Sequence, residues 1–212
     1  MTDTREAILS RIRNSIGPAS GDAQREREAI QRTYLRTGSL DPDSRLRLFV
    51  ERLRDYDANV VETGTASLSS AIAAILRANG QRKVISADGL PPELLPPDFR
   101  FLPERDADRA DLNDCDGILT RCAVAIAATG SIVLTHGPGE GARRLTLLPD
   151  RHLCIVRAEQ VVETVPEAFD RLAPFSTMPI TFISGPSATA DIEMTRIRGV
   201  HGPRFLDVAL VR

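Results

Sequence analysis

The chain has 212 residues, of which 27 are basic and 29 acidic, so its formal net charge is −2. This length suits one domain with at most a small appendage, and a chain of this size buries about 70% of its unfolded surface without help from disulfides or metals. The 42% apolar content excludes a disordered or collagen-like chain, and the near-neutral charge argues against a general role in nucleic-acid binding.

The first 57 residues are dense in charge, with 11 arginines and 10 acidic residues. Ile8, Ile12 and Ile16 recur every four residues, which predicts a helix with one apolar stripe that ends at Gly17. A second charged segment, residues 22–36, has few apolar positions. It is either a solvent-facing helix or an arm that binds a partner.

A third helix is predicted to begin at Asp41 and Pro42, because aspartate caps helix N-termini and proline fits the first turn. The apolar positions on one face of this helix are Leu46, Phe49, Val50 and Leu53. We therefore expect residues 1–57 to form a helical N-terminal appendage and residues 58–212 to form the main domain. The appendage either covers one face of the main sheet or serves as an interaction arm.

From residue 59 onward, short β-branched runs alternate with helical patterns. The expected strands span residues 60–61, 83–86, 99–102, 117–120, 131–135, 152–157, 179–183 and 205–211. The expected helices span residues 68–78, 122–128 and 161–172, the last interrupted by Pro166. This alternation predicts an α/β fold with a mostly parallel sheet covered on both faces, with the strands at 131–135 and 152–157 as candidate neighbours.

The cysteines and the N-terminus indicate the compartment. Cys115, Cys122 and Cys154 are an odd number without a Cys-x-x-Cys pair, which favours a reducing compartment. The same pattern disfavours an iron–sulfur cluster or a zinc site bound by this chain alone. The N-terminus lacks the apolar core of a signal peptide, and no stretch approaches the roughly 18 apolar residues of a membrane span. We expect a cytoplasmic protein that does not cross a membrane.

The first segment that could carry chemistry is TGSIVLTHGPGEGARR, residues 129–144, in which a strand runs into three glycines and two arginines. Glycines can expose backbone N–H groups to an anion, and arginines add bidentate contacts to phosphate or carboxylate. The spacing matches neither the Walker loop nor the dinucleotide-binding pattern G-x-G-x-x-G. Gly137, Gly139 and Arg143 therefore belong either to an anion site or to an ordinary glycine-rich hairpin loop.

The second segment combines SGPSATADIE, residues 184–193, with GVHGPR, residues 199–204. It follows a predicted strand, and ligands of open α/β sheets bind beyond the carboxyl ends of strands. Asp191 and Glu193 lie two positions apart, so an extended chain places both carboxylates on one side. His201 stands between two glycines, where a tight backbone can hold its imidazole toward a ligand. So many glycines, prolines and polar residues predict a ligand-binding or active site here.

Other chemistries are less well supported. A metal site would need Asp191, Glu193 and His201, with His136 or His152, but no characteristic ligand spacing is present. Ser187 does not sit in the G-x-S-x-G elbow of hydrolases. Imine chemistry has only Lys83, the single lysine, at the start of a predicted strand rather than at its ligand-facing end.

Together, AATGSIVLTHGPGEGARRLTLLP (residues 127–149) and SGPSATADIEMTRIRGVHGPR (residues 184–204) resemble the lactate-utilization (LUD) domain. More narrowly, they resemble the lactate utilization protein C (LutC) family, also called YkgG. The likeness covers about residues 59–212. It implies a fold similar to the NagB/RpiA/CoA-transferase group, a three-layer α/β/α sandwich.

The resemblance also implies a function. Members of this family belong to a cytoplasmic three-protein system that oxidises L-lactate to pyruvate, in which two companion proteins carry the iron–sulfur ligands. This chain lacks those cysteine motifs. The resemblance therefore implies an accessory or substrate-binding subunit of an oxidoreductase complex. Such a subunit would bind lactate or another anion and no cofactor of its own.

The resemblance and the glycine-rich segment together give the candidate site. His201 and Asp191 are the candidate catalytic residues, with His201 as base for a lactate hydroxyl and Arg204 holding the carboxylate. The candidate ligand-binding residues are Thr129, Gly130, Ser131, Gly137, Gly139, Arg143, Ser184, Gly185, Ser187, Glu193 and Arg204.

Two alternatives remain open. One is a stand-alone enzyme of the same fold, similar to the ATP-dependent 5-formyltetrahydrofolate cyclo-ligases, although residues 137–144 lack the tyrosine and lysine expected of such a loop. The other is a non-catalytic interaction module that docks through residues 1–57.

Overall fold

The computed structural model describes residues 4–16, 23–189, 197–199 and 201–212. The chain divides into two compact units, Met1–Tyr34 and Leu35–Arg212. The first contains two helices, α1 (Thr4–Ile16) and α2 (Ala23–Ala29). The apolar stripe of Ile8, Ile12 and Ile16 lies on α1 as predicted, and all three side chains are exposed.

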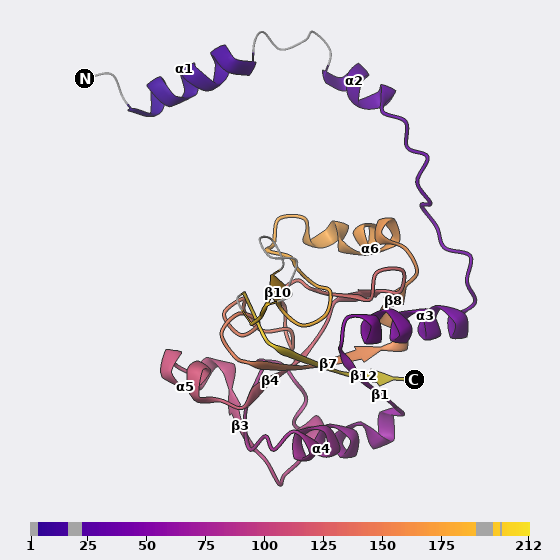
Figure 1. The fold of residues 1–212 in the computed structure, drawn as a ribbon, viewed down its shortest axis with the longest axis vertical. Helices are drawn as coiled ribbons and strands as arrows, with labels where there is room; N and C mark the ends of the chain where they lie inside the picture. Colours follow the sequence, from indigo (N-terminus) through magenta and orange to yellow (C-terminus); the bar gives the residue numbers. More distant parts are fainter. Residues whose placement is uncertain (1–3, 17–22, 190–196, 200) are drawn as a thin grey trace. The chain divides into compact units, whose positions relative to one another are not determined.

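The second unit is built on a six-stranded sheet in which every neighbouring pair of strands is parallel. The strand order across it is β1-β12-β7-β4-β2-β3 (Figure 1). The strands are β1 (Asn59–Thr63), β2 (Lys83–Ser86), β3 (Arg100–Pro103), β4 (Gly117–Arg121), β7 (Arg151–Arg157) and β12 (Phe205–Val211). The predicted α/β class with a mostly parallel sheet is confirmed.

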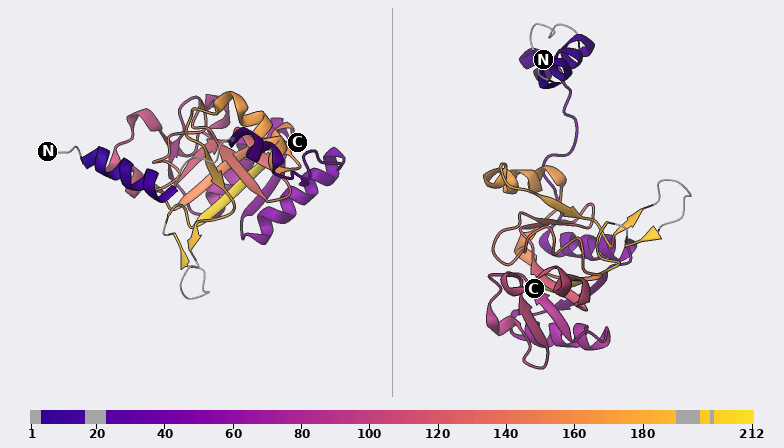
Figure 2. Two further views of the ribbon diagram at one scale, coloured as in Figure 1. Left: turned by 90° about the horizontal axis from the view of Figure 1, so that it is seen from above. Right: turned by 90° about the vertical axis from the view of Figure 1, so that its left-hand side faces the viewer.

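Helices cover both faces of this sheet (Figure 2). On one face, α4 (Leu68–Ala78) packs Ile72 and Leu76 against Leu153 of β7. On the other face lie α3 (Pro42–Asp55) and α5 (Arg109–Asp114). The α3 helix begins as predicted, with the Asp41 carboxylate accepting a hydrogen bond from the Ser44 N–H and Pro42 in the first turn.

The four predicted apolar residues of α3 are all buried in the core of the second unit. They pack with residues of the main sheet such as Val156 and Val208. The α3 helix therefore shares one hydrophobic core with the main sheet. The domain boundary after residue 57 stays a prediction.

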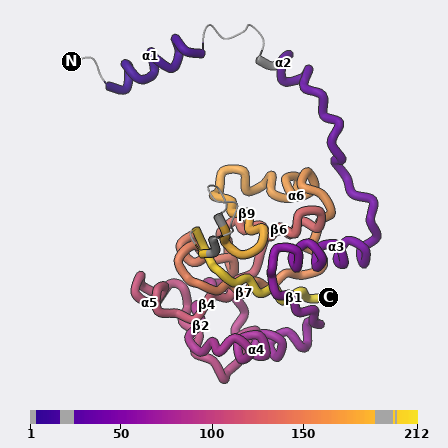
Figure 3. The backbone as a smooth tube through the Cα atoms, in the orientation of Figure 1, coloured from indigo at the N-terminus to yellow at the C-terminus, as the bar shows by residue number. Residues whose placement is uncertain are grey.

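A second, four-stranded sheet of order β8-β5-β6-β9 packs beside α3 on the same face. Its strands are β5 (Val124–Ile126), β6 (Ser131–Leu134), β8 (Val161–Val162) and β9 (Thr181–Ile183). The outer face of this sheet is covered by α6 (Val165–Leu172), next to β6 and β9 in Figure 3. The remaining elements are a hairpin of β10 (Ala188–Thr189) and β11 (Ile197–Arg198), and the 3₁₀ turns η1 (Thr65–Ser67), η2 (Pro92–Leu94), η3 (Glu104–Asp106), η4 (Ala158–Gln160) and η5 (Ala173–Phe175).

This second sheet corrects three sequence-based predictions. Residues 122–128 do not form a helix, because Ala125 packs toward the main sheet while Val124 and Ile126 pack toward α6, the two-faced alternation of a strand. The strands at 131–135 and 152–157 are not neighbours, because β6 and β7 belong to different sheets. Pro166 starts α6 rather than interrupting it.

Candidate functional site

A pocket of about 240 Å³ opens between β9, the turn after it and the amino ends of β7 and β12. We call it the β9 pocket. It gathers candidates from both chemistry-bearing segments, since Ser184, Gly185, Ser187, His201 and Arg143 all line it. Residues more than fifty positions apart in sequence thus line one pocket.

Backbone contacts hold the two motif segments together. The Ser187 N–H donates to the Pro203 carbonyl at 2.8 Å, and the His201 N–H donates to the Ser187 hydroxyl oxygen at 3.1 Å. Gly185 has φ +80°, and a Cβ there would lie 2.5 Å from Cβ of Tyr56, so only glycine fits this turn. The turn that carries Ser184 and Ser187 therefore holds the backbone of His201 beside the pocket.

A chain of hydroxyls leads to the pocket from the buried strand β6. The Thr129 and Ser131 hydroxyl oxygens are 2.8 Å apart, and those of Ser131 and Ser184 are 2.7 Å apart. Thr129 and Ser131 thus lie behind the pocket wall and orient Ser184. Gly130 has a different role, because its missing Cβ would lie 2.8 Å from the Arg52 backbone in α3.

The residues that line the pocket include His152 and Thr181, which are absent from the ligand-binding residues predicted from the sequence. His152 is 1% exposed, and its Nε2 lies 2.7 Å from the Thr120 hydroxyl oxygen. Sequence reasoning considered His152 only as a metal ligand. The missing information was the register of β4 against β7. In that register Ile118 pairs with His152 and Thr120 pairs with Cys154, which brings the Thr120 hydroxyl close to the His152 ring.

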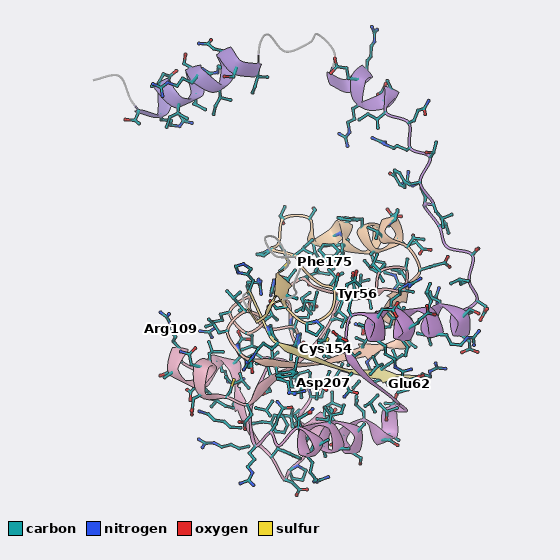
Figure 4. All side chains as sticks on the ribbon, in the orientation of Figure 1. Tyr56, Glu62, Arg109, Cys154, Phe175 and Asp207 are labelled. Carbon is teal, nitrogen blue, oxygen red and sulfur yellow. The ribbon has the colours of Figure 1, made fainter. Side chains whose placement is uncertain are left out.

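Buried thiols lie beneath His152. Burial raises the pKa of the Cys154 thiol, but hydrogen bonds from Cys122, His152 and Thr120 outweigh burial and lower that pKa to about 6. The same pairing with Cys154, followed by burial, raises the pKa of Cys122 well above its usual value. Of the two thiols, Cys154 is therefore the one whose pKa is lowered, and its position is labelled in Figure 4.

The two candidate arginines differ in their surroundings. Arg204 donates from Nε and Nη2 to the two carboxylate oxygens of Asp150, at 2.5 Å each, and this pairing raises the pKa of Arg204. Arg143 lines the pocket and donates from Nη1 to the Thr146 carbonyl and hydroxyl at 3.0 and 2.9 Å. Among the described residues that line the pocket, Arg143 is the guanidinium placed to meet an anion.

The glycine-rich loop faces elsewhere. Gly137 lines a second pocket, and Gly139 accepts a hydrogen bond from the Arg121 N–H at the end of β4. Several N–H groups of this loop donate to acidic residues of the chain itself. Thr135 N–H donates to the Glu140 carboxylate, and Ala142 N–H donates to that of Glu104 at 3.0 Å. These donors are therefore satisfied internally instead of by an external anion.

The remaining candidates concern metals and the lone lysine. Asp191 and Glu193 lie outside the described residues. Within the described ranges, no group of three or more His, Cys, Asp or Glu side chains is close enough to hold a metal ion. The Lys83 ammonium lies 3.1 Å from the carboxylates of Asp111 and Asp114, and hydrogen bonds to them raise the pKa of Lys83. Such a lysine stays protonated and is poorly suited to imine formation.

Comparison with known proteins extends the likeness beyond the motif segments. A family model for the LUD domain matches residues 3–211. Lactate utilization protein C of Deinococcus radiodurans is 42% identical over 169 residues, covering 78% of this chain and 79% of that protein. Lactate utilization protein C of Bacillus subtilis is 26% identical over 231 residues, covering 94% and 92%. A crystal structure of a DUF162 family protein from Deinococcus radiodurans is also similar, with a TM-score of 0.72 and 37% identity over 82% of this chain and 100% of that one.

None of the helices in the described part of the chain has the length and apolar character needed to cross a bilayer.

Proposed function

The chain belongs to the LUD domain family, and we propose that it takes part in lactate utilization by binding a small carboxylate, L-lactate or its product pyruvate, in the β9 pocket. The similarity to relatives named lactate utilization protein C supports a role in lactate utilization. The observation that carries the site is the convergence of Arg143, His201 and the Ser184 and Ser187 hydroxyls on one pocket.

The size and lining of the β9 pocket suit such a substrate. Its volume of about 240 Å³ lies below the roughly 300–1,000 Å³ typical of sites for drug-sized ligands. A guanidinium at one wall can pair with a carboxylate, and hydroxyls at another wall can hydrogen-bond to an α-hydroxyl or keto oxygen. Arg143 replaces Arg204 as the proposed carboxylate partner, because the guanidinium of Arg204 is paired with Asp150.

Oxidation of lactate to pyruvate removes two electrons and two protons, so the reaction needs both a base and an electron acceptor. His201 is the proposed base for the hydroxyl proton. The hydrogen on C2 leaves as a proton to water, and the two electrons pass one at a time to an acceptor, for which we propose the iron–sulfur clusters of companion proteins. On this proposal the chain is the substrate-binding subunit of an oxidoreductase complex in the cytoplasm.

An exposed apolar patch beside the β9 pocket supports a protein partner. Phe169 and Phe182 form it, and Phe175 and Met178 lie between them in the sequence; all four side chains are at least a third exposed. The rings of Phe169 on α6 and Phe182 on β9 lie 5.9 Å apart, and Phe182 also lines the pocket. Exposed apolar patches of this kind mark protein interaction sites. A partner seated here would lie next to the bound substrate.

Replacing Arg143 by glutamine is expected to weaken L-lactate binding roughly 10- to 100-fold, because hydrogen bonds to a charged group contribute about 1.5–3 kcal/mol. Calorimetric titration of the purified chain measures this. Arg204→Gln is the matched control, expected to leave the dissociation constant within about twofold. A larger loss in Arg204→Gln than in Arg143→Gln would reverse the assignment of the carboxylate partner.

Replacing His201 by alanine is expected to slow lactate oxidation about 10²- to 10⁴-fold in a system reconstituted with its iron–sulfur proteins, the range of a general base. Leaving the chain out should lower the rate at least as much. The unfolding midpoint should stay unchanged, because the His201 side chain is exposed. An unaltered rate in His201→Ala would rule out the base, and an unaltered rate without the chain would rule out its part in the oxidation.

A further inference from the structure

The second pocket lies at the carboxyl ends of three adjacent parallel strands. Asp88 and Gly89 follow β2, Glu104 and Arg105 follow β3, and the Gly139 carbonyl accepts from the N–H of the last residue of β4. We call it the strand-end pocket. The chain runs from β2 outward to β3, then returns to β4 on the other side of β2 and continues to β7 and β12. Ligands of open parallel sheets bind beyond the strand ends at such a reversal of strand order.

The strand-end pocket is large and has a wall of small residues. Its volume of about 670 Å³ falls within the roughly 300–1,000 Å³ of ligand sites. Gly89, Gly137, Pro138, Gly141 and Ala142 line it, so a flat ring can approach the backbone closely. Gly141 has φ +74° and a Cβ there would lie 2.6 Å from Cδ2 of Leu145, which requires glycine at that position.

Charged side chains line the same pocket. Arg105 Nη1 lies 3.3 Å from an Asp88 carboxylate oxygen. Arg144 Nη2 donates to the Glu104 carbonyl at 3.3 Å, and its Nε lies 3.7 Å from the Glu104 carboxylate. Unlike Arg204, which donates to both oxygens of one carboxylate at 2.5 Å, Arg105 and Arg144 contact carboxylates at 3.3 Å or more. Their side chains are 68% and 49% exposed, and a guanidinium carries five N–H donors, so both can also meet a phosphate. The half-exposed Asp88 carboxylate can accept hydrogen bonds from sugar hydroxyls.

We propose that the strand-end pocket binds a mononucleotide, with its planar ring against the glycine-rich wall and its phosphate at Arg105 and Arg144. Each part of such a ligand has a counterpart there: small residues for the ring, a carboxylate for the sugar and guanidiniums for the phosphate. This site is additional to the proposed function and does not depend on lactate binding.

A hydrogen-bonded pair, His136 and Thr181, links the two pockets. His136 lines the strand-end pocket, and its Nδ1 donates to the Gly141 carbonyl at 2.7 Å. Its Nε2 lies 2.8 Å from the Thr181 hydroxyl oxygen, and Thr181 lines the β9 pocket. A nucleotide in the strand-end pocket would therefore be a close neighbour of a ligand in the β9 pocket.

Direct titration with flavin mononucleotide and with adenosine monophosphate tests the proposal. Binding of flavin mononucleotide is followed by the fluorescence of the flavin ring, and binding of adenosine monophosphate by calorimetry. We expect saturable binding of at least one of the two probes and at least tenfold weaker binding of the matching nucleoside, riboflavin or adenosine, which lacks the phosphate. Absence of saturable binding by both nucleotides would overturn the proposal.

Two variants test whether the nucleotide binds in the strand-end pocket. Gly137→Leu takes up room at the pocket wall, where the backbone permits a side chain because a Cβ would meet no atom closer than 3.6 Å. Arg144→Gln removes a phosphate donor without filling the pocket. Each should weaken nucleotide binding at least tenfold, whereas Arg143→Gln should weaken only lactate binding. Wild-type nucleotide affinity in both Gly137→Leu and Arg144→Gln would overturn the site, whatever the outcome for lactate.

Discussion

Replacing Asp207 by alanine is expected to lower the free energy of unfolding by about 3–5 kcal/mol, the cost of breaking a buried ion pair by removing one partner. Asp207, labelled in Figure 4, is 1% exposed on β12, the strand between β1 and β7 in the main sheet. Its carboxylate accepts from Asn59 Nδ2 and from Arg151 Nη1, both at 2.8 Å. The Arg151 guanidinium, stacked 4.3 Å from the Phe205 ring centroid, would remain largely buried without its counter-charge.

A second aspartate–arginine pair in the same chain provides the control. Asp150 and Arg204 are both about half exposed, so Asp150→Ala should cost no more than about 1 kcal/mol. Urea unfolding followed by circular dichroism compares the two variants, and Asp207→Asn tests whether the charge or the hydrogen bonds matter more. Equal losses in Asp207→Ala and Asp150→Ala would contradict the structural role assigned to Asp207.

The main sheet was predictable because its strands have a simple pattern. The runs at 83–86, 152–157 and 205–211 are short, rich in β-branched residues and almost wholly buried, as strands of a parallel sheet covered on both faces must be. The second sheet was not predictable in the same way. Residues 122–128 are small and apolar, and such a short run fits a buried helix as well as a buried strand until its packing partners are known.

The candidate site was predicted in composition but not in detail. The glycines and prolines of residues 184–187 and 201–203 indicated tight turns, and those turns do meet at the β9 pocket. The choice between arginines was beyond sequence reasoning. Arg204 is nearer to His201 along the chain, but its guanidinium pairs with Asp150, which lies more than fifty residues away in sequence. Arg143 instead reaches the pocket from the glycine-rich segment.

Removing residues 1–57 is expected to prevent folding, whereas removing residues 1–34 should change the free energy of unfolding by about 1 kcal/mol or less. The longer deletion removes Leu46, Phe49, Val50 and Leu53 from the core. Burial of each such side chain contributes about 1.5–3 kcal/mol, so roughly 6–12 kcal/mol is lost. A domain has a total stability of about 5–15 kcal/mol, which leaves little or nothing for the shortened chain.

The shorter deletion removes α1 and α2. The structure describes all thirteen residues of α1, and none of them is buried. It keeps the segment before α3, where the N–H groups of Gly38 and Leu40 donate to the carboxylates of Glu167 and Glu163. Urea unfolding and the dispersion of amide proton resonances distinguish the two fragments. If residues 58–212 alone unfolded cooperatively at the midpoint of the full chain, α3 would belong to a separable appendage. Loss of cooperative unfolding in that fragment alone would place the boundary of the folded domain between residues 34 and 42, ahead of α3.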